Sequence, residues 1–325
     1  MKKIFYVILL SSVFSVISCH GEAITKLENG LSVATLKDAY NFDEFLQKGG
    51  ALNDKDVVRF LIEGAGCSTI QLPLADDGYC FGRNFDWNRC NALILITYPT
   101  DGYASISTVN TDFIKAGAGT PFLPEEMLLR AAVYAPLDGM NEKGLCVSVN
   151  MIQDSETINQ NTGKPGLTTT TAIRLLLDKA GTTQEAIKLL EQYDLHASFG
   201  YMVHFAITDA SGKAVAVEYI NNKMMVIETP ILTNFYLTEG EKYGIGTKQS
   251  HERFNVLKKN VEHISNQKLF VNEESVVKIL ESVSKHNYNE FESTEWSVVF
   301  NQKNLSATYY HRERYGKSWS FSLNN

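Results

Sequence analysis

The sequence has 325 residues, with 30 Lys and Arg against 37 Asp and Glu, which gives a formal net charge of −7. Hydrophobic residues make up 44% and charged residues 21%, which excludes a disordered or collagen-like chain and is typical of a globular protein. The acidic balance argues against a nucleic-acid partner, and five Cys are too few for a disulfide scaffold.

The first 18 residues have the pattern of a secretory signal peptide, because Lys2 and Lys3 precede an apolar run over residues 4–17. The run is shorter than the roughly 20 residues that a membrane-spanning helix needs. It ends in Val-Ile-Ser-Cys at 16–19, which resembles a bacterial lipobox, where the Cys becomes the lipidated first residue. We therefore expect an exported bacterial lipoprotein, periplasmic or at the cell surface, whose only membrane contact is a lipid on Cys19. An ordinary secretory leader and an incidental Cys are the alternatives.

The chain from residue 24 to 63 is mixed and predicted to be helical in parts, with a capped helix at 54–62 that ends at the Gly-Ala-Gly of 64–66. After it, short β-rich segments separated by turn residues predict strands. These strands cover residues 67–72, 79–83, 93–98, 103–109 and 145–151.

The second half of the chain alternates between helical and strand patterns. Two helices are predicted at 170–180 and from a capping box at 182–185 to about 193. Strands at 201–208, 214–220 and 223–228, helices at 252–261 and 272–285, and two final strands at 295–300 and 306–311 follow. This order predicts an α+β layered domain rather than a parallel Rossmann sheet.

Cys67 is the candidate nucleophile, since it opens one predicted strand while Arg83 and Asp86 close the next. Two antiparallel strands joined by a turn at 76–78 would bring the three side chains together. A nucleophilic thiol needs a base. The seven His are scattered and form no metal-binding pattern, so a papain-like Cys/His pair stays open without a nominated His.

Another source of the base is the chain itself. If the peptide bond between Gly66 and Cys67 is cut, Cys67 gains a free α-amine, whose ordinary pKa of about 7.7–8.0 is close to that of a thiol. The amine can then act as the general base for its own thiol. Gly66 has no side chain to obstruct attack on its carbonyl.

Three segments together identify a family resemblance. They are Gly-Cys-Ser-Thr at 66–69, Gly-Arg-Asn-Phe-Asp-Trp at 82–87 and Asp-Gly-Met-Asn-Glu-Lys-Gly-Leu at 138–145. In this order they resemble the choloylglycine hydrolase superfamily, which includes bile salt hydrolases, penicillin V acylases, acid ceramidase and N-acylethanolamine acid amidase. Leu-Thr-Asn at 232–234 and Ser-x-x-Arg at 250–253 are also similar.

The resemblance implies a four-layer αββα N-terminal nucleophile hydrolase sandwich and a role for each matching residue. Cys67 is the expected nucleophile and base, Arg83 the cation beside its thiol, and Asp86 the carboxylate that holds its amine. The remaining expected residues are Asn150 and Asn234 in the oxyanion hole and Arg253 as a supporting charge.

Each of these residues also has a purely structural interpretation. Arg83 and Asp86 could form a simple ion pair, and Asn150 and Asn234 could end strands or make turns. Asn141 and Gly144 favour a turn. Cys80, Cys90 and Cys146 are expected to be small buried side chains, with a Cys80–Cys90 disulfide as the alternative.

The predicted organisation is a signal peptide at 1–18, a propeptide at 19–66 and a catalytic domain at 67–325. The predicted function is an autoproteolytically activated amidohydrolase acting on a small N-acyl amide, with no metal or cofactor. Acyl transfer to an amine and an inactive ligand-binding lipoprotein are the alternatives, and a homo-oligomer is left open. Four aromatic residues are candidates for the acyl pocket, namely Phe85, Trp87, Tyr134 and Phe235.

Overall fold

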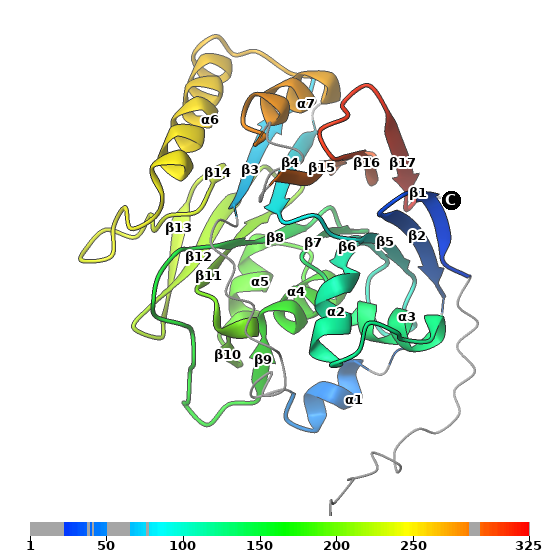
Figure 1. The fold of residues 1–325 in the computed structure, drawn as a ribbon. Helices are drawn as coiled ribbons and strands as arrows, with labels where there is room; N and C mark the ends of the chain where they lie inside the picture. Colours follow the sequence, from blue (N-terminus) through cyan, green and yellow to red (C-terminus); the bar gives the residue numbers. More distant parts are fainter. Residues whose placement is uncertain are drawn as a thin grey trace, which may run out of the picture.

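The computed structural model describes residues 23–37, 40, 42–50, 66–75, 78–285 and 293–324. Within them, two β-sheets pack face to face through one shared hydrophobic core, and helices cover their outer faces (Figure 1). This is the predicted αββα arrangement, so the fold prediction is confirmed. The predicted signal peptide, the lipidation at Cys19 and the helix at 54–62 lie outside the described residues.

The larger sheet has nine strands in the order β1-β2-β5-β6-β7-β8-β11-β12-β13. All neighbours are antiparallel except β2 and β5, which run parallel. The strands are β1 Thr25–Glu28, β2 Leu31–Leu36, β5 Ala92–Thr97, β6 Ser105–Asn110, β7 Asp138–Asn141, β8 Cys146–Met151, β11 Val203–Thr208, β12 Ala214–Ile220 and β13 Lys223–Glu228.

The smaller sheet has six antiparallel strands in the order β14-β3-β4-β15-β16-β17. They are β14 Ile231–Leu232, β3 Gly66–Pro73, β4 Tyr79–Trp87, β15 Ser293–Asn301, β16 Ser306–His311 and β17 Ser318–Ser322. Strands β3, β4 and β15 are buried along almost their whole length because they have neighbours on both edges and layers on both faces.

Two pairs of helices form the outer layers. Helices α4 (Thr169–Lys179) and α5 (Thr183–Leu190) pack on the nine-stranded sheet, while α6 (Lys248–Asn266) and α7 (Glu273–Ser282) pack on the six-stranded sheet. Each has a side-chain N-cap, and Thr182 confirms the cap predicted for α5. Three shorter helices, α1 (Phe42–Gln47), α2 (Thr111–Gly117) and α3 (Glu125–Val133), and the parallel pair β9 (Gly166–Thr168) and β10 (Asp194–His196) complete the described fold.

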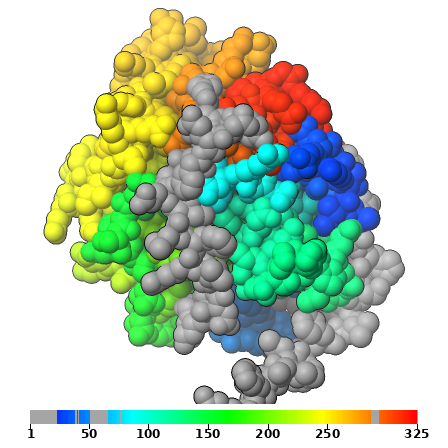
Figure 2. Space-filling model, viewed as in Figure 1, coloured from blue at the N-terminus to red at the C-terminus, as the bar shows by residue number. Residues whose placement is uncertain are grey.

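Helix α1 agrees with the prediction that residues 24–63 are helical in parts, but strands at both ends of the chain were not predicted. The region after residue 24 begins with the strands β1 and β2, because β2 buries Leu31, Ala34 and Leu36 by pairing with β5. The chain also ends in three strands rather than two, since β17 adds to the edge of β16. As a result the N-terminal strands lie against the C-terminal segment on the molecular surface (Figure 2).

Cys80 and Cys90 do not form the disulfide that the sequence left open. The two buried thiols belong to different hydrophobic clusters, Cys80 beneath α6 and α7 and Cys90 in the core between the sheets. Asn141 makes the expected turn, because its side chain accepts hydrogen bonds from the backbone N–H groups of Lys143 and Leu145.

No helix in the described part of the chain is both long enough and apolar enough to cross a membrane.

Candidate active site

The ladder between β3 and β4 brings the predicted nucleophile and cation together. Cys67 pairs with Phe85, and Thr69 pairs with Arg83. Because side chains alternate along a strand, Cys67 and Arg83 point to the same face of the sheet. The Nη2 atom of Arg83 lies 3.7 Å from the Sγ atom of Cys67, as the sequence predicted.

Arg83 is fully buried and fixed by partners from the other sheet. Its Nε atom lies 2.8 Å from Oδ2 of Asp138, which is also fully buried, and Nη1 donates to the carbonyl oxygen of Val149 at 2.8 Å. Trp296 donates to the same Asp138 oxygen at 3.0 Å. Asp138 was not among the predicted site residues, although it begins the 138–145 motif. It holds the guanidinium that faces the thiol.

The surroundings of Cys67 favour the protonated form of its thiol. Burial raises the pKa of the Cys67 thiol above its ordinary value, and the Arg83 guanidinium opposes this rise. The Asp86 carboxylate raises the same pKa further. Arg83 alone therefore does not create a thiolate, and the site needs a base close to the sulfur.

The main-chain nitrogen of Cys67 is held by polar side chains from other elements. It donates to Oδ1 of Asn234 at 2.7 Å. The same Oδ1 accepts from Nη2 of Arg253 at 2.8 Å, and Nη1 of Arg253 donates to the Cys67 carbonyl oxygen at 3.0 Å. Arg253 and Asn234 thus position the backbone on both sides of the nucleophile's Cα atom.

Asp86 lies on the opposite face of the sheet from the thiol, opposite Gly66 in the ladder. Its Oδ2 atom pairs with Nη1 of Arg253 at 2.9 Å, and its Oδ1 accepts from Thr294 at 2.7 Å. A Cβ atom on Gly66 would lie only 3.0 Å from both the Asp86 carboxylate and the Arg253 guanidinium. This close approach favours glycine before the nucleophile.

The two candidate oxyanion-hole residues flank Cys67 from neighbouring elements. Asn150, on β8, accepts from Nη1 of Arg83 at 3.3 Å and donates from Nδ2 to the Thr233 carbonyl oxygen at 3.0 Å. Asn234 donates from Nδ2 to the Met151 carbonyl oxygen at 2.7 Å. Each amide nitrogen carries a second hydrogen that can be offered to a substrate oxygen. All six predicted residues therefore meet in one buried network.

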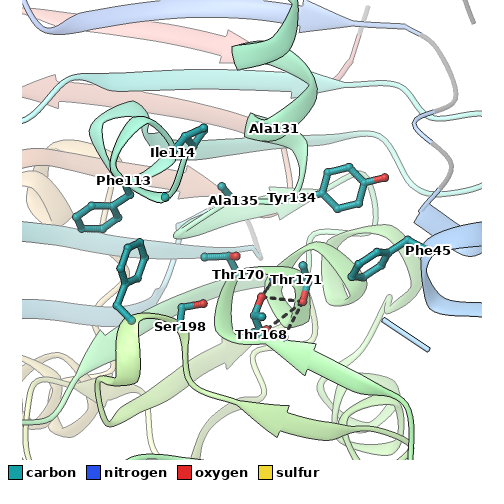
Figure 3. Close-up of a pocket in the computed structure, with 12 residues that line it drawn as sticks. Phe45, Phe113, Ile114, Ala131, Tyr134, Ala135, Thr168, Thr170, Thr171 and Ser198 are labelled. Atoms are coloured by element: carbon teal, nitrogen blue, oxygen red, sulfur yellow. Dashed lines mark hydrogen bonds between the residues drawn. The ribbon is translucent and has the colours of Figure 1, made fainter. Parts of the chain in front are cut away.

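An apolar cavity of about 60 Å³ opens beside Cys67, with Phe85, Trp87 and Tyr201 among its aromatic lining. A second cavity of about 430 Å³ adjoins it. The two cavities share four lining residues, namely Phe113, Thr170, Ser198 and Phe199. In the second cavity Phe113 and Ser198 lie at one end, with Phe45 and Tyr134 at the other (Figure 3).

The aromatic predictions are thus partly corrected. Phe85 and Trp87 line the cavity at Cys67, whereas Tyr134 lines only the second cavity. Phe235 lines neither of these cavities, because its ring stacks on His251 at 4.0 Å between ring centroids and against Phe254. Phe113 and Phe199 were missed, since nothing near them in the sequence indicates a site.

Comparison with solved structures supports the fold. A mutant of a conjugated bile acid hydrolase from Clostridium perfringens superposes with a TM-score of 0.60 at 18% identity, covering 79% of this chain and 92% of that one. A penicillin V acylase from Agrobacterium tumefaciens superposes with a TM-score of 0.50 at 15% identity, covering 80% and 87%. Identities this low establish the shared architecture only.

Comparison with curated sequences gives a partial match. Penicillin V acylase from Pectobacterium atrosepticum is 29% identical over 107 residues, 30% of this chain and 28% of that protein's own length. The family model for acyl-coenzyme A:6-aminopenicillanic acid acyl-transferase matches residues 129–314. This stretch contains Asn150, Asn234 and Arg253, and it begins after Cys67, Arg83 and Asp86.

The family match covers more than half of the chain, and the sandwich and the buried Cys67 network agree with it. The chain belongs to the acyl-coenzyme A:6-aminopenicillanic acid acyl-transferase family, within the choloylglycine hydrolase superfamily of N-terminal nucleophile hydrolases.

Proposed function

We propose that this protein is a cysteine amidohydrolase that cuts itself before Cys67 and then hydrolyses the linear amide bond of N-acyl substrates. The observation that carries the proposal is the placement of one residue. The Cys67 sulfur lies between Arg83 and an apolar cavity, while the Cys67 nitrogen is held by Asn234. One residue can thus supply both the nucleophile and, once cleaved, the base.

The first step is activation. The Cys67 thiol attacks the Gly66 carbonyl carbon, and the bond from that carbon to the Cys67 nitrogen breaks. Water then hydrolyses the resulting thioester, which leaves a carboxylate on Gly66 and a free amine on Cys67. The close contact of Gly66 with Asp86 and Arg253 supports this step, because it holds the scissile bond beside charged groups.

The second step is catalysis on the substrate. The Cys67 amine takes the thiol proton, and the thiolate attacks the substrate's amide carbon. The developing oxyanion receives N–H donors from the side chains of Asn150 and Asn234. The substrate's amine takes the proton from the Cys67 amine and leaves. Water then hydrolyses the acyl thioester, which returns the Cys67 thiol and releases a free acid.

The lining of the two cavities indicates the class of acyl group. Aromatic and aliphatic carbons surround the thiol, so an apolar acyl group gains free energy by leaving water. The solved neighbours are named for conjugated bile acids and penicillin V. We propose an N-acyl amide with an apolar acyl group, a class that includes N-acyl amines and amino acids, conjugated bile salts and penicillin V-like amides.

A panel of acyl amides tests this function, with product masses as the readout and a Cys67→Ala variant as the matched control. We expect a free acid and a free amine from at least one apolar substrate with the wild-type chain. We expect an uncut chain and no product with Cys67→Ala. An active, unprocessed Cys67→Ala protein would refute the mechanism.

Acyl transfer is a second candidate, favoured by the description of the matched family as an acyl-transferase. Transfer uses the same acyl-thioester, with an amine instead of water as the second nucleophile. Adding an amine acceptor to the reaction separates the two. Formation of the new amide at the expense of the free acid would identify a transferase.

A further inference from the structure

Three buried side chains on adjacent strands of the large sheet form a row beside the nucleophile. Asn150 on β8 pairs with His204 on β11, and Glu218 lies on the next strand, β12 (Figure 1). All three are 0% exposed. Asn150 belongs to the proposed oxyanion hole, whereas His204 and Glu218 have no part in the chemistry described above.

The row ends on the peptide unit between Thr233 and Asn234. The Thr233 carbonyl oxygen lies 2.9 Å from Nε2 of His204 and accepts from Asn150 at 3.0 Å. On the other side of the same peptide unit, the Asn234 N–H donates to the Ser250 hydroxyl at 2.7 Å. Both ends of this peptide plane are therefore fixed, which fixes the direction of the Asn234 side chain.

His204 is held by an acceptor at each ring nitrogen. Nδ1 lies 3.0 Å from Oε1 of Glu218, and Nε2 faces the Thr233 carbonyl oxygen. A carboxylate and a carbonyl oxygen accept hydrogen bonds, so each ring nitrogen of His204 faces an acceptor. The Glu218 carboxylate also accepts from the backbone N–H groups of Leu237 and Thr238 at 2.8 Å each.

Ionisation of Glu218 agrees with this geometry. Burial raises the pKa of its carboxyl, but the hydrogen bonds from His204, Thr238 and Leu237 outweigh burial and hold the pKa below its ordinary value. The His204–Glu218 pair contacts the Thr233 carbonyl oxygen on the side toward Cys67. A neutral imidazole could donate to only one of its two partners.

We propose that His204 is a positioning residue. It fixes the Thr233–Asn234 peptide unit and thereby holds the side-chain oxygen Oδ1 of Asn234 against the Cys67 nitrogen. This inference rests on the proposed function for its effect on turnover. Its effect on Cys67 itself is independent of any substrate, because Asn234 contacts the Cys67 nitrogen directly.

Two substitutions of His204 test the proposal in the full chain. His204→Met approximates the size of the ring and removes both donors. We expect it to lower kcat about tenfold, which corresponds to about 1.4 kcal/mol in the barrier, with little change in KM. His204→Gln keeps an N–H donor that can reach the Thr233 carbonyl, so we expect it to restore most of the lost turnover. His204→Asn, whose shorter amide does not reach this oxygen, replaces His204→Met in the comparison if the Met variant does not fold.

The second readout is the rate at which iodoacetamide alkylates Cys67, followed across pH on the peptide that contains it. We expect His204→Met to shift this profile and His204→Gln to leave it near that of the wild type. The matched control is His311→Met, since His311 is also buried and lies 2.6 Å from a glutamate, Glu28, on β16, which is three strands away from β3 in the six-stranded sheet. It should lower the melting temperature without changing either readout.

The outcomes separate this inference from the proposed function. A shifted alkylation profile together with no hydrolysis of any acyl amide by the wild type would refute the function and support the positioning role. The positioning role would be wrong if His204→Met kept the wild-type kcat and the wild-type alkylation profile. It would also be wrong if a folded His204→Gln protein lost as much turnover as His204→Met.

Discussion

At the scale of single residues, the charge of Arg83 acts on the Cys67 thiol. Arg83 is buried between Cys67 and Asp138, and it is the group that most strongly lowers the pKa of a thiol whose pKa burial raises. If the guanidinium is removed, burial and the Asp86 carboxylate still act on the Cys67 thiol, and both favour its protonated form.

We therefore expect Arg83→Met to raise the Cys67 pKa and to move its alkylation profile to higher pH. Alkylation at neutral pH becomes slower, and turnover falls with it. Measuring the iodoacetamide rate on the Cys67 peptide across pH checks the sign. A profile that moves to lower pH would contradict the role assigned to Arg83.

The same substitution leaves Asp138 buried without its cation, which costs about 3–5 kcal/mol of stability in other buried pairs. Arg83→Met combined with Asp138→Asn removes that charge. We expect the double variant to regain stability in urea unfolding while its thiol stays unreactive. Recovery of reactivity along with stability would show that Arg83 acts only on folding.

At the scale of elements, the segment between β10 and β11 shapes the cavity at Cys67 and the larger cavity beside it. Phe199 has a φ of 58°, in the left-handed region that bulky residues rarely adopt, and its ring lies 5.1 Å from that of Phe113 between centroids. Both rings line both cavities. Strain retained at such a position is typical of a functional segment.

We expect Phe199→Ala to widen the connection between the cavity at Cys67 and the larger cavity. This should raise kcat/KM for substrates with long acyl chains relative to substrates with short ones. A series of amides that differ only in acyl length measures this ratio. Phe122→Ala is the control, since Phe122 is 86% exposed. An unchanged ratio in Phe199→Ala would show that the two rings do not limit acyl length.

The sequence predicted the elements whose signal is local. Strands β12 and β13 have the predicted ends, because their β-rich runs are bounded by turn residues. Strand β1 was missed because its side chains are half-exposed or exposed and it gains stability from pairing with β2. Strand β17 was missed for the same reason, since within the described residues it is an edge strand that pairs with β16.

The site could be predicted only in part. Cys67 and Arg83 lie on consecutive strands and point to one face, so antiparallel pairing is enough to place their side chains together. Asp86 points to the opposite face, which the sequence did not predict. His204, Glu218 and Phe199 come from strands and turns that meet the site only after the sheets pack. No local pattern marks a buried His as the partner of a carbonyl contributed by a segment 29 positions away.

At the scale of the whole molecule, the described residues from 23 to 50 are built into the domain. Strand β2 pairs in parallel with β5, and Phe42 is buried in the core between the sheets. Tyr40 donates to Asp178 at 2.6 Å, and Lys179 pairs with Asp43 at 2.9 Å. These contacts do not depend on the peptide bond between Gly66 and Cys67.

We therefore expect the N-terminal chain to stay bound after cleavage. The two chains should elute together in size-exclusion chromatography and separate on a denaturing gel. Tyr40→Phe removes a hydrogen bond to a buried carboxylate, worth about 1 kcal/mol, and should release the small chain at a lower urea concentration. Loss of the small chain from wild-type protein in native buffer would contradict this expectation.

The most direct test of the central claim is the mass of the peptide that begins at Cys67, measured during turnover of an N-acyl amide and quenched in acid. We predict a chain whose first residue is Cys67, carrying the acyl group on its sulfur as a thioester that hydroxylamine removes. A chain that turns over substrate without an N-terminus at Cys67, or that carries the acyl group on another residue, would contradict it.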